Sequence, residues 1–260
     1  MHAFYDTRAI IGKRIMPNPC RSSRIVVLTG AGVSAESGLA TFRGASGLWE
    51  NVRPKDLATP EAFAKRPLKV LAFYTARRRA LLASAVAPNA AHIALAAFER
   101  RFRGEFLLVT QNVDDLHERA GSQKLRHMHG ELLRTRCANC GHEFASTADI
   151  STADSCPACG RVGRLRPAVV WFGEMPLFMD EISAVLGRCD LFIAIGTSGQ
   201  VYPAAGFVEI ARRVGARTVE INIEKTTASS LFQESVRSPA SNAVPIFLER
   251  IECDLLRLNG

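Results

Sequence analysis

The sequence contains no long hydrophobic run, and this absence excludes two classes of protein. No apolar stretch approaches the roughly 20 residues that cross a lipid bilayer. The first 24 residues alternate Arg and Lys with Ile, Pro and Asn, and they lack the apolar stretch of about 7–15 residues that marks a secretory signal. We therefore expect a soluble, cytoplasmic protein that has no membrane partner.

Repeats, low-complexity tracts and an extreme composition are also missing. Of the 260 residues, 47% are hydrophobic and 22% are charged, which argues against disorder, collagen and coiled coils. The net charge of +8 has no concentrated source, because the densest basic run, Arg77-Arg78-Arg79, is three residues long. Acidic substrates or protein partners explain such a scattered excess as well as nucleic acid does, so a nucleic-acid partner is not favoured.

Short apolar runs alternate with amphipathic segments along the chain. Five runs are too continuous for half-exposed strands and too short for helices: 25–28, 106–109, 168–171, 191–195 and 218–223. Helical spacing of apolar residues predicts helices at 67–82, 90–101, 113–120, 203–214 and 244–258. The alternation predicts an α/β fold with a doubly wound, Rossmann-like parallel sheet. Residues 45–88 and 137–159 interrupt it, and we expect them to form a smaller second lobe together.

The first predicted strand runs into a glycine loop, Gly30-Ala31-Gly32-Val33-Ser34-Ala35, with the pattern G-x-G-x-x-A. Glycines here allow a tight turn and let a dinucleotide pyrophosphate approach the backbone amides. By itself, the motif is explained equally well by an ordinary glycine turn. A dehydrogenase would place an acidic residue at the end of a second strand about 20 residues later. Glu50 has that spacing, but its surroundings are not strand-like.

Seven cysteines are an odd number, and four of them form two close pairs. Cys137 and Cys140 are followed after 15 residues by Cys156 and Cys159, which is a four-cysteine zinc spacing. Four thiolates fill a tetrahedral shell, so the Zn²⁺ is expected to be structural. Chance spacing or disulfide pairing is the alternative.

Polar side chains follow the predicted strand 106–109. Gln111, Asn112 and Asp114 can hydrogen-bond ribose hydroxyls and a carboxamide, whereas helix capping explains one of the three. His129 precedes a glycine, and an imidazole with a pKa of about 6.5 is a natural base. On spacing alone, however, His129 is no better a candidate than His92, His117 or His127.

In this order, the motifs resemble those of the sirtuin family of the bacterial, desuccinylase type, from about residue 24 to residue 251. The matching motifs are Gly30-Ala-Gly-Val-Ser-Ala-Glu-Ser-Gly38, Thr41-Phe-Arg43, Thr110-Gln-Asn-Val-Asp114, His129-Gly-Glu131, the cysteine pairs, Val170-Trp-Phe-Gly-Glu174, Gly196-Thr-Ser198 and Asn222-Ile-Glu224. The resemblance implies an NAD⁺-dependent protein-lysine deacylase. It also implies a discontinuous Rossmann-like domain (22–44, 90–130 and 166–260), a helical module (45–89), a zinc module (131–165) and an N-terminal extension (1–21).

The resemblance further implies a reaction that consumes NAD⁺ as a co-substrate. The acyl-lysine carbonyl oxygen attacks the nicotinamide ribose carbon, and nicotinamide leaves. His129 then acts as general base toward the ribose hydroxyls, and water releases free lysine and 2′-O-acyl-ADP-ribose.

Family positions that contact NAD⁺ match a larger set of residues. Asn112 and Asp114 match those that hold the nicotinamide carboxamide, and Gln111 matches one near the ribose. The remaining matches are Gly30, Ala31, Gly32 and Ala35 for the pyrophosphate, Thr41, Phe42, Arg43 and Trp49 in the following loop, Gly196, Thr197 and Ser198 for phosphate and ribose, and Asn222, Glu224 and Ala240 for adenosine.

Two further groups match substrate positions of the family. Phe172, Gly173 and Glu174, together with Val201, match the edges between which an acyl-lysine peptide adds as an extended strand. Tyr74 and Arg77 stand three apart on one helix face and resemble the pair that binds the distal carboxylate of a succinyl or malonyl group. Ala58 matches the small residue that enlarges the acyl pocket. The structural alternative is a core-edge tyrosine beside one arginine of a solvated basic run.

Two other functions remain open at this point. Mono-ADP-ribosyl transfer shares the step that cleaves nicotinamide. A zinc-ribbon nucleic-acid module would suit the charge and the cysteines, but it leaves the glycine loop and Gln111–Asp114 unexplained. We expect a monomer that removes succinyl, malonyl and acetyl groups from lysine.

Overall fold

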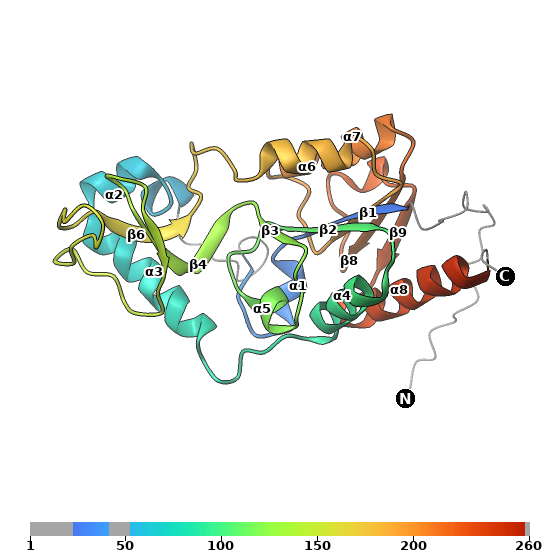
Figure 1. Ribbon diagram of the computed structural model, residues 1–260, viewed down its shortest axis with the longest axis horizontal. Helices are drawn as coiled ribbons and strands as arrows, with labels where there is room; N and C mark the ends of the chain where they lie inside the picture. The colour runs from blue at the N-terminus through green and yellow to red at the C-terminus, as the bar shows by residue number, and fades with distance from the viewer. Residues whose placement is uncertain (1–22, 42–52, 258–260) are drawn as a thin grey trace.

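The computed structural model describes residues 23–41 and 53–257, with side chains to residue 252. A six-stranded sheet occupies one end of an elongated molecule, and a three-stranded sheet occupies the other (Figure 1). The large sheet has the strand order β3-β2-β1-β7-β8-β9, and all of its pairings are parallel. Its strands are β1 (Arg24–Thr29), β2 (Glu105–Thr110), β3 (Leu125–His127), β7 (Leu191–Ile195), β8 (Arg217–Asn222) and β9 (Glu234–Arg237). The predicted doubly wound fold is confirmed, with the change of winding direction between β1 and β7.

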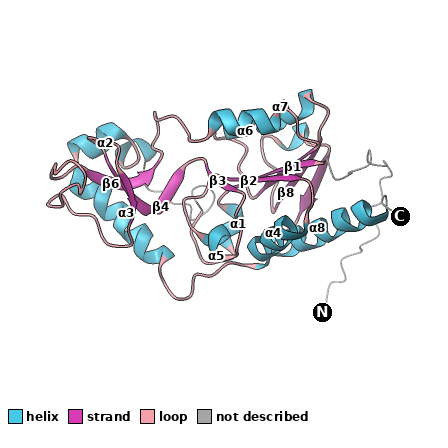
Figure 2. Ribbon diagram, in the orientation of Figure 1, coloured by secondary structure: helices cyan, strands magenta, loops and turns pink. Residues whose placement is uncertain are grey.

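Helices cover both faces of this sheet, as Figures 1 and 2 show. On one face lie α4 (Ala90–Arg101) and α8 (Ala240–Arg257), and on the other lie α6 (Met179–Leu186) and α7 (Phe207–Arg213). Successive side chains of a strand point to opposite faces. Val27 therefore packs with α4 and α8, and Val26 packs with α6 and α7. Both valines are fully buried, and burial of such a side chain is worth about 1.5–3 kcal/mol.

The small sheet pairs antiparallel strands in the order β5-β4-β6. Its strands are β4 (Gly130–Cys137), β5 (Glu143–Ala145) and β6 (Leu165–Val169), and α2 (Pro60–Lys65) and α3 (Pro67–Leu81) pack against it. The apolar run at 168–171 was predicted to lie in the parallel sheet, and this was wrong. Its first residues end β6, which is wholly buried, and such burial produces the same apolar run in either sheet.

Short helical turns complete the chain: α1 (Gly32–Ala35), α5 (Leu116–Arg119) and the 3₁₀ turns η2 (Pro54–Asp56), η3 (Ala204–Gly206) and η4 (Ser229–Leu231). The predicted helix at 113–120 is reduced to α5, whose N-cap is Asp115, and Asp114 Oδ1 accepts a hydrogen bond from Leu116 N at the first residue of this turn. The segment predicted as a helix at 203–214 divides into η3 and α7. The helix predicted at 244–258 begins earlier, at Ala240.

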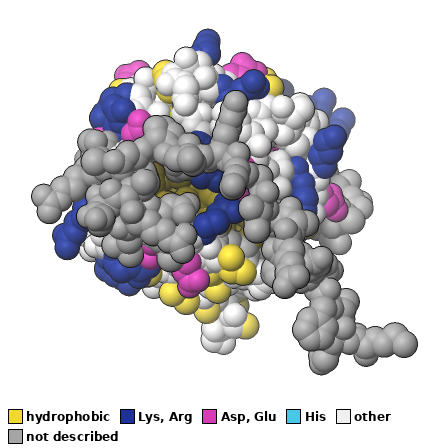
Figure 3. All heavy atoms as spheres, turned by 90° about the vertical axis from the view of Figure 1, so that its right-hand side faces the viewer, with side chains coloured by type: hydrophobic (Ala, Val, Ile, Leu, Met, Phe, Trp, Pro, Cys, Tyr) yellow, Lys and Arg dark blue, Asp and Glu magenta, His cyan; other side chains and the backbone are white. Residues whose placement is uncertain are grey.

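Charges are dispersed over the surface. On the end of the molecule shown in Figure 3, Lys and Arg side chains lie in separate groups interspersed with Asp and Glu. Many arginines pair with carboxylates, as Arg24 does with Asp190 and Arg101 with Glu252. No helix within residues 23–41 and 53–257 combines the length and apolar character that a membrane crossing requires.

Candidate active site

The loops that follow β1 and β7 meet through glycines. Gly30 N donates to Ile195 O at 3.0 Å, and Gly32 N donates to Gly196 O at 2.9 Å. A Cβ on Gly32 would lie 2.7 Å from Gly196 Cα, and a Cβ on Gly196 would lie 2.6 Å from Val33 N. Gly196 also has a φ of +60°, which favours glycine. The glycines are therefore required by the contact between the two loops, and the amides of Gly30 and Gly32 already have protein partners.

A buried polar network follows β1 and β2. Asn112 Nδ2 donates to Gly30 O and to Ser34 Oγ, both at 3.1 Å, and Ser34 Oγ donates to Asp114 Oδ2 at 3.1 Å. Ser34, Asn112 and Asp114 expose 2%, 3% and 8% of their surface. Burial raises the pKa of Asp114, while hydrogen bonds from the Leu116 amide and the Ser34 hydroxyl oppose the rise.

This network joins two sequence-predicted residues, Asn112 and Asp114, to one that sequence reasoning missed. Ser34 lies inside the quoted glycine motif, and a hydroxyl in the first turn after a glycine loop was the available signal. Both hydrogens of Asn112 Nδ2 are donated within the network, whereas the carboxylate oxygens of Asp114 and Asn112 Oδ1 keep acceptor capacity. The corner therefore suits a carboxamide such as that of nicotinamide.

His129 is positioned by the strand end that carries Gln111. Gln111 N donates to Thr29 O at 2.9 Å, and Gln111 O lies 3.1 Å from His129 Nδ1. A carbonyl oxygen only accepts hydrogen bonds, so Nδ1 carries the proton and Nε2 keeps its lone pair. Burial lowers the pKa of His129, although the hydrogen bond to Gln111 opposes this. The half-buried imidazole is thus neutral at pH 7 and can accept a proton.

The structure distinguishes His129 from the other three candidate histidines. His92 Nδ1 accepts from Asn89 N in the cap of α4, and burial lowers the pKa of His92 to about 4. His117 is completely buried, and its pKa lies well below the ordinary value for the same reason. His127 is engaged by Glu118, with 2.6 Å between Nε2 and Oε1.

Tyr74 and Ala58 lie in one apolar cluster beneath the end of β6. Tyr74 Oη accepts from Trp171 Nε1 at 2.9 Å, and Ala58 O accepts from Phe172 N at 2.9 Å. Burial raises the pKa of Tyr74 to about 12. The phenol therefore stays protonated at neutral pH and keeps its own proton to donate.

The arginine run of α3 has three separate environments. Arg78 is 2% exposed and donates to Leu132 O at 2.8 Å, and Arg79 is exposed and paired with Asp149. Arg77 has buried guanidinium nitrogens, and its Cζ lies 5.6 Å from the Phe73 ring centroid. Burial lowers the pKa of Arg77, while the electrostatic influence of Tyr74 and Asp114 raises it. The run is therefore not a solvated face, and Arg77 lies within electrostatic reach of the Asp114 corner.

The loop after β6 carries three of the expected peptide-binding residues. Phe172 is 47% exposed, and Gly173 has a φ of +91° with open space beside it. Glu174 points inward instead, because it accepts from Arg166 Nη1 at 2.7 Å and from Trp171 N at 2.7 Å. Its carboxylate is thus occupied within the loop. Val201, on the loop after β7, is half-buried, and its carbonyl accepts from the Ala205 amide.

The expected adenosine and phosphate residues lie at the ends of β7 and β8. Thr197 and Asn222 are brought together, since Asn222 Nδ2 donates to Thr197 O at 2.7 Å. Ser198 is half-buried beside them, and Glu224 is exposed. Ala240 is 7% exposed at the start of α8, where it belongs to the main core.

The remaining cofactor candidates lie on the segment that follows β1. Ala31 is half-buried at the start of α1, Ala35 is exposed at its end, and Thr41 is half-buried. Phe42, Arg43 and Trp49 lie outside the described residues.

The four paired cysteines converge at the end of β4 and on the segment that joins β4 to β6. Cys137 Sγ lies 3.8 Å from Cys159 Sγ, and Cys140 Sγ lies 3.7 Å from Cys156 Sγ. All four sulfurs lie within 4.8 Å of one another. A zinc–sulfur bond of about 2.3 Å places tetrahedral ligands about 3.8 Å apart, whereas a disulfide requires about 2.05 Å. The cluster therefore fits one structural Zn²⁺.

Comparisons with known proteins agree with this geometry. Residues 30–203 match the Sir2 family model. The NAD-dependent protein deacylase of Escherichia coli strain K12 is 52% identical over 244 residues, covering 94% of this chain and 88% of the relative. The NAD-dependent protein deacylase SIR2rp3 of Leishmania major is 54% identical over 230 residues, covering 87% of this chain and 95% of the relative. The crystal structure of a Sir2 homologue in complex with NAD superposes with a TM-score of 0.80 at 42% identity, covering 89% of this chain and 90% of that one.

Proposed function

The chain belongs to the Sir2 family and is an NAD-dependent protein deacylase, and we propose that the acyl groups it removes from lysine are succinyl and malonyl as well as acetyl. NAD⁺ is its co-substrate, and its substrates are acyl-lysine side chains of proteins or peptides.

The observation that carries the acyl preference is that Tyr74 is buried and that Arg77, three residues later on α3, has buried guanidinium nitrogens. A protonated phenol and a guanidinium together offer donors to a carboxylate, and neither loses its proton at neutral pH. Ala58 stands in the same apolar cluster as Tyr74 and adds little volume to it. Acetyl-lysine has no distal carboxylate, so it gains nothing from these two donors.

His129 is proposed as the general base, and its tautomer supports this role. Because Nδ1–H is directed at Gln111 O, Nε2 is the nitrogen that accepts a ribose hydroxyl proton. A base of lowered pKa is already unprotonated at neutral pH. Asn112 and Asp114 are the proposed contacts for nicotinamide. Thr197 and Asn222, which follow β7 and end β8, are the proposed contacts for phosphate and ribose.

The acyl preference is tested by comparing succinyl-, malonyl- and acetyl-lysine versions of one peptide at a fixed NAD⁺ concentration. Arg77→Met and Tyr74→Phe should each lower kcat/KM for the succinyl peptide by about ten- to a hundredfold, which corresponds to the loss of one charge-assisted hydrogen bond. The acetyl peptide should change by less than about threefold. Arg79→Met removes an exposed arginine from the same helix and is the matched control. Equal losses on both peptides would contradict carboxylate binding, and detection of 2′-O-acyl-ADP-ribose separates deacylation from ADP-ribosyl transfer.

A further inference from the structure

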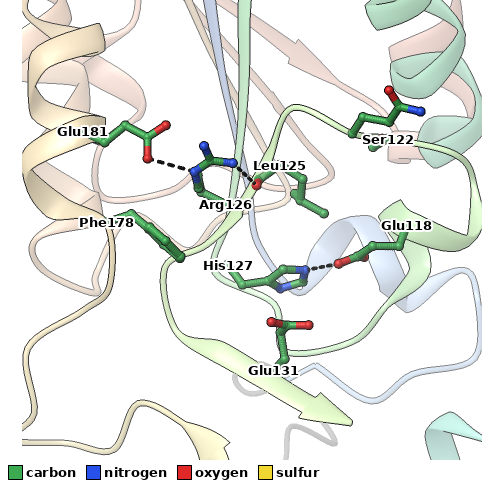
Figure 4. A pocket seen from close by; sticks show the side chains of 9 residues that line it. Glu118, Ser122, Leu125, Arg126, His127, Glu131, Phe178 and Glu181 are labelled. Carbon is green, nitrogen blue, oxygen red and sulfur yellow. Dashed lines mark hydrogen bonds and ion pairs between the residues drawn. The ribbon is translucent and has the colours of Figure 1, made fainter. Parts of the chain in front are cut away.

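His127 bridges a surface pocket and the backbone of Asn112. His127 Nδ1 lies 2.9 Å from Asn112 O. Its Nε2 lies 2.6 Å from Glu118 Oε1, the contact drawn as a dashed line in Figure 4. Carbonyl and carboxylate oxygens only accept hydrogen bonds, so both ring nitrogens donate and the ring is an imidazolium. Burial lowers the pKa of His127, but the hydrogen bond and charge of Glu118, the hydrogen bond to Asn112 and the charge of Glu131 together raise it overall.

The contact between His127 and Glu118 in this pocket indicates an ion pair and not two ligands of one metal ion. It encloses about 330 Å³, and Glu118, His127 and Glu131 place their ligand atoms within 4.8 Å of one another. Neighbouring ligands on one cation with bonds of 2.0–2.2 Å are separated by about 2.8 Å or more. The contact of 2.6 Å between His127 and Glu118 is shorter, as a charge-assisted hydrogen bond should be.

The turn from Asn112 to Leu116 is held at both ends by this pair. Glu118 belongs to α5, which begins two residues after Asp114, and His127 ends β3. The amide of Asn112 donates to Thr110 Oγ1 at 3.0 Å, and its side chain is engaged by Gly30 and Ser34. Its carbonyl is the remaining backbone group, and the partner that the structure gives it is His127.

We propose that His127 and Glu118 form a positioning pair, which orients the peptide of Asn112 and thereby sets the nicotinamide affinity of the site. The inference rests on the proposed role of Asn112 and Asp114 in holding the nicotinamide carboxamide. Both ring nitrogens of His127 are engaged by Asn112 O and Glu118, so we give the pair no part in proton transfer. The pair acts through the backbone from which both carboxamide-binding side chains extend, so its loss should affect nicotinamide binding more than proton transfer by His129.

Four variants of the zinc-replete full chain test this pair. His127→Leu removes both donors, and His127→Asn retains one, because its amide nitrogen occupies the place of Nδ1. Glu118→Gln removes the charge from a side chain that is 40% exposed, so folding is not at risk. Glu181→Gln is the matched control, since Glu181 lines the same pocket but pairs with Arg126 at 2.8 Å.

The measurements are the inhibition constant of nicotinamide, the KM of NAD⁺ and kcat, all with an acetyl-lysine peptide. We expect His127→Leu to raise both constants on the order of tenfold, with a smaller change in kcat. His127→Asn should restore most of the loss, Glu118→Gln should raise both constants a few-fold, and Glu181→Gln should leave them unchanged. Unchanged constants in Glu118→Gln, or an Asn variant no better than the Leu variant, would overturn the proposal.

Asn112→Ala separates this proposal from the one on which it rests. If Asn112→Ala weakens nicotinamide inhibition and His127→Leu does not, the positioning pair is refuted while the nicotinamide role of Asn112 stands. If Asn112→Ala itself has no effect, both fail. The acyl preference is judged independently, because every measurement here uses the acetyl substrate.

Discussion

Replacing Glu174 by Gln should destabilise the small lobe, because it leaves a buried cation without its counter-charge. Arg166 has a side-chain exposure of 6%, and its Cζ lies 3.3 Å from the Trp171 ring centroid. Glu174 accepts two hydrogen bonds from this guanidinium, at 2.7 and 2.9 Å, and a third from Trp171 N at 2.7 Å. A glutamine side chain keeps the shape, but it turns one donor toward the guanidinium.

The size of the effect follows from how far each partner is buried. Breaking a fully buried ion pair costs about 3–5 kcal/mol, and Glu174 retains 27% exposure, which places the loss near the lower end, at about 3 kcal/mol. For a chain of this length, that corresponds to a fall in Tm of roughly 6–12 °C. Glu105→Gln breaks the exposed pair with Arg188, whose side chains are 48% and 37% exposed, and should cost less than about 1 kcal/mol.

The assay is thermal and urea unfolding of both variants at pH 7 with zinc held constant, repeated at acid pH. Arg166 and the Trp171 amide lower the pKa of Glu174 below 4.5, although burial opposes them. The stabilisation is therefore present above pH 4.5 and is lost as the pH falls through the lowered pKa. The gap between wild type and Glu174→Gln should close in acid. A loss of stability that is equal in Glu174→Gln and Glu105→Gln, or that does not change with pH, would refute the reasoning.

Three further predictions follow from the site. Cys140→Ser should release the single zinc equivalent per chain and lower Tm, as measured by metal analysis and calorimetry; retained zinc with unchanged melting would contradict the structural role. His129→Ala should abolish deacylation with the fold intact. In the wild type, the acidic limb of the kcat/KM profile should lie below pH 6.5, because burial lowers the pKa of His129 and the base is lost only as the pH falls through that pKa. An acidic limb centred above pH 7 would count against His129. Gly196→Ala should lower the free energy of unfolding by more than about 2 kcal/mol, because its Cβ would lie 2.6 Å from Val33 N. Gly173→Ala, also at positive φ but in open space, should lower it by about 1 kcal/mol. Equal losses of stability in urea unfolding would contradict the contact between the two loops.

The hydrophobic pattern of the sequence predicted the strands that are buried on both faces. The strands β1, β2, β7 and β8 are buried on both faces, so each appears in the sequence as a continuous apolar run. The strand β4 was missed, because three of its four partly exposed positions carry Glu or Arg and resemble a loop. Assignment of residues 168–171 to the parallel sheet failed because an apolar run reports burial and not the identity of the neighbouring strand.

Residue type alone did not distinguish the histidines or the arginines of the site. His92, His117, His127 and His129 differ in their burial and in their hydrogen-bond partners, which residue type does not encode. Arg78 reaches Leu132, 54 residues away, while the adjacent Arg79 pairs at the surface. The cysteine spacing was informative because tetrahedral coordination imposes its own local geometry, and the sulfur separations agree with it.

The antiparallel ladder of the small sheet has a consequence for how the zinc-bearing segment is attached. Cys137 lies opposite Leu165, and Gly130 lies opposite Val169. The chain therefore enters the zinc-bearing segment from β4 and leaves it through β6, and these two strands are hydrogen-bonded to each other. Residues 138–164 are therefore an inserted segment whose two ends are held together by the hydrogen bonds between β4 and β6. Asp149 pairs with Arg79 and Ala148 accepts from the buried Arg78, so a change of length should be tolerated only in the rest of the segment, where it should leave the strand ends of the large sheet unaltered.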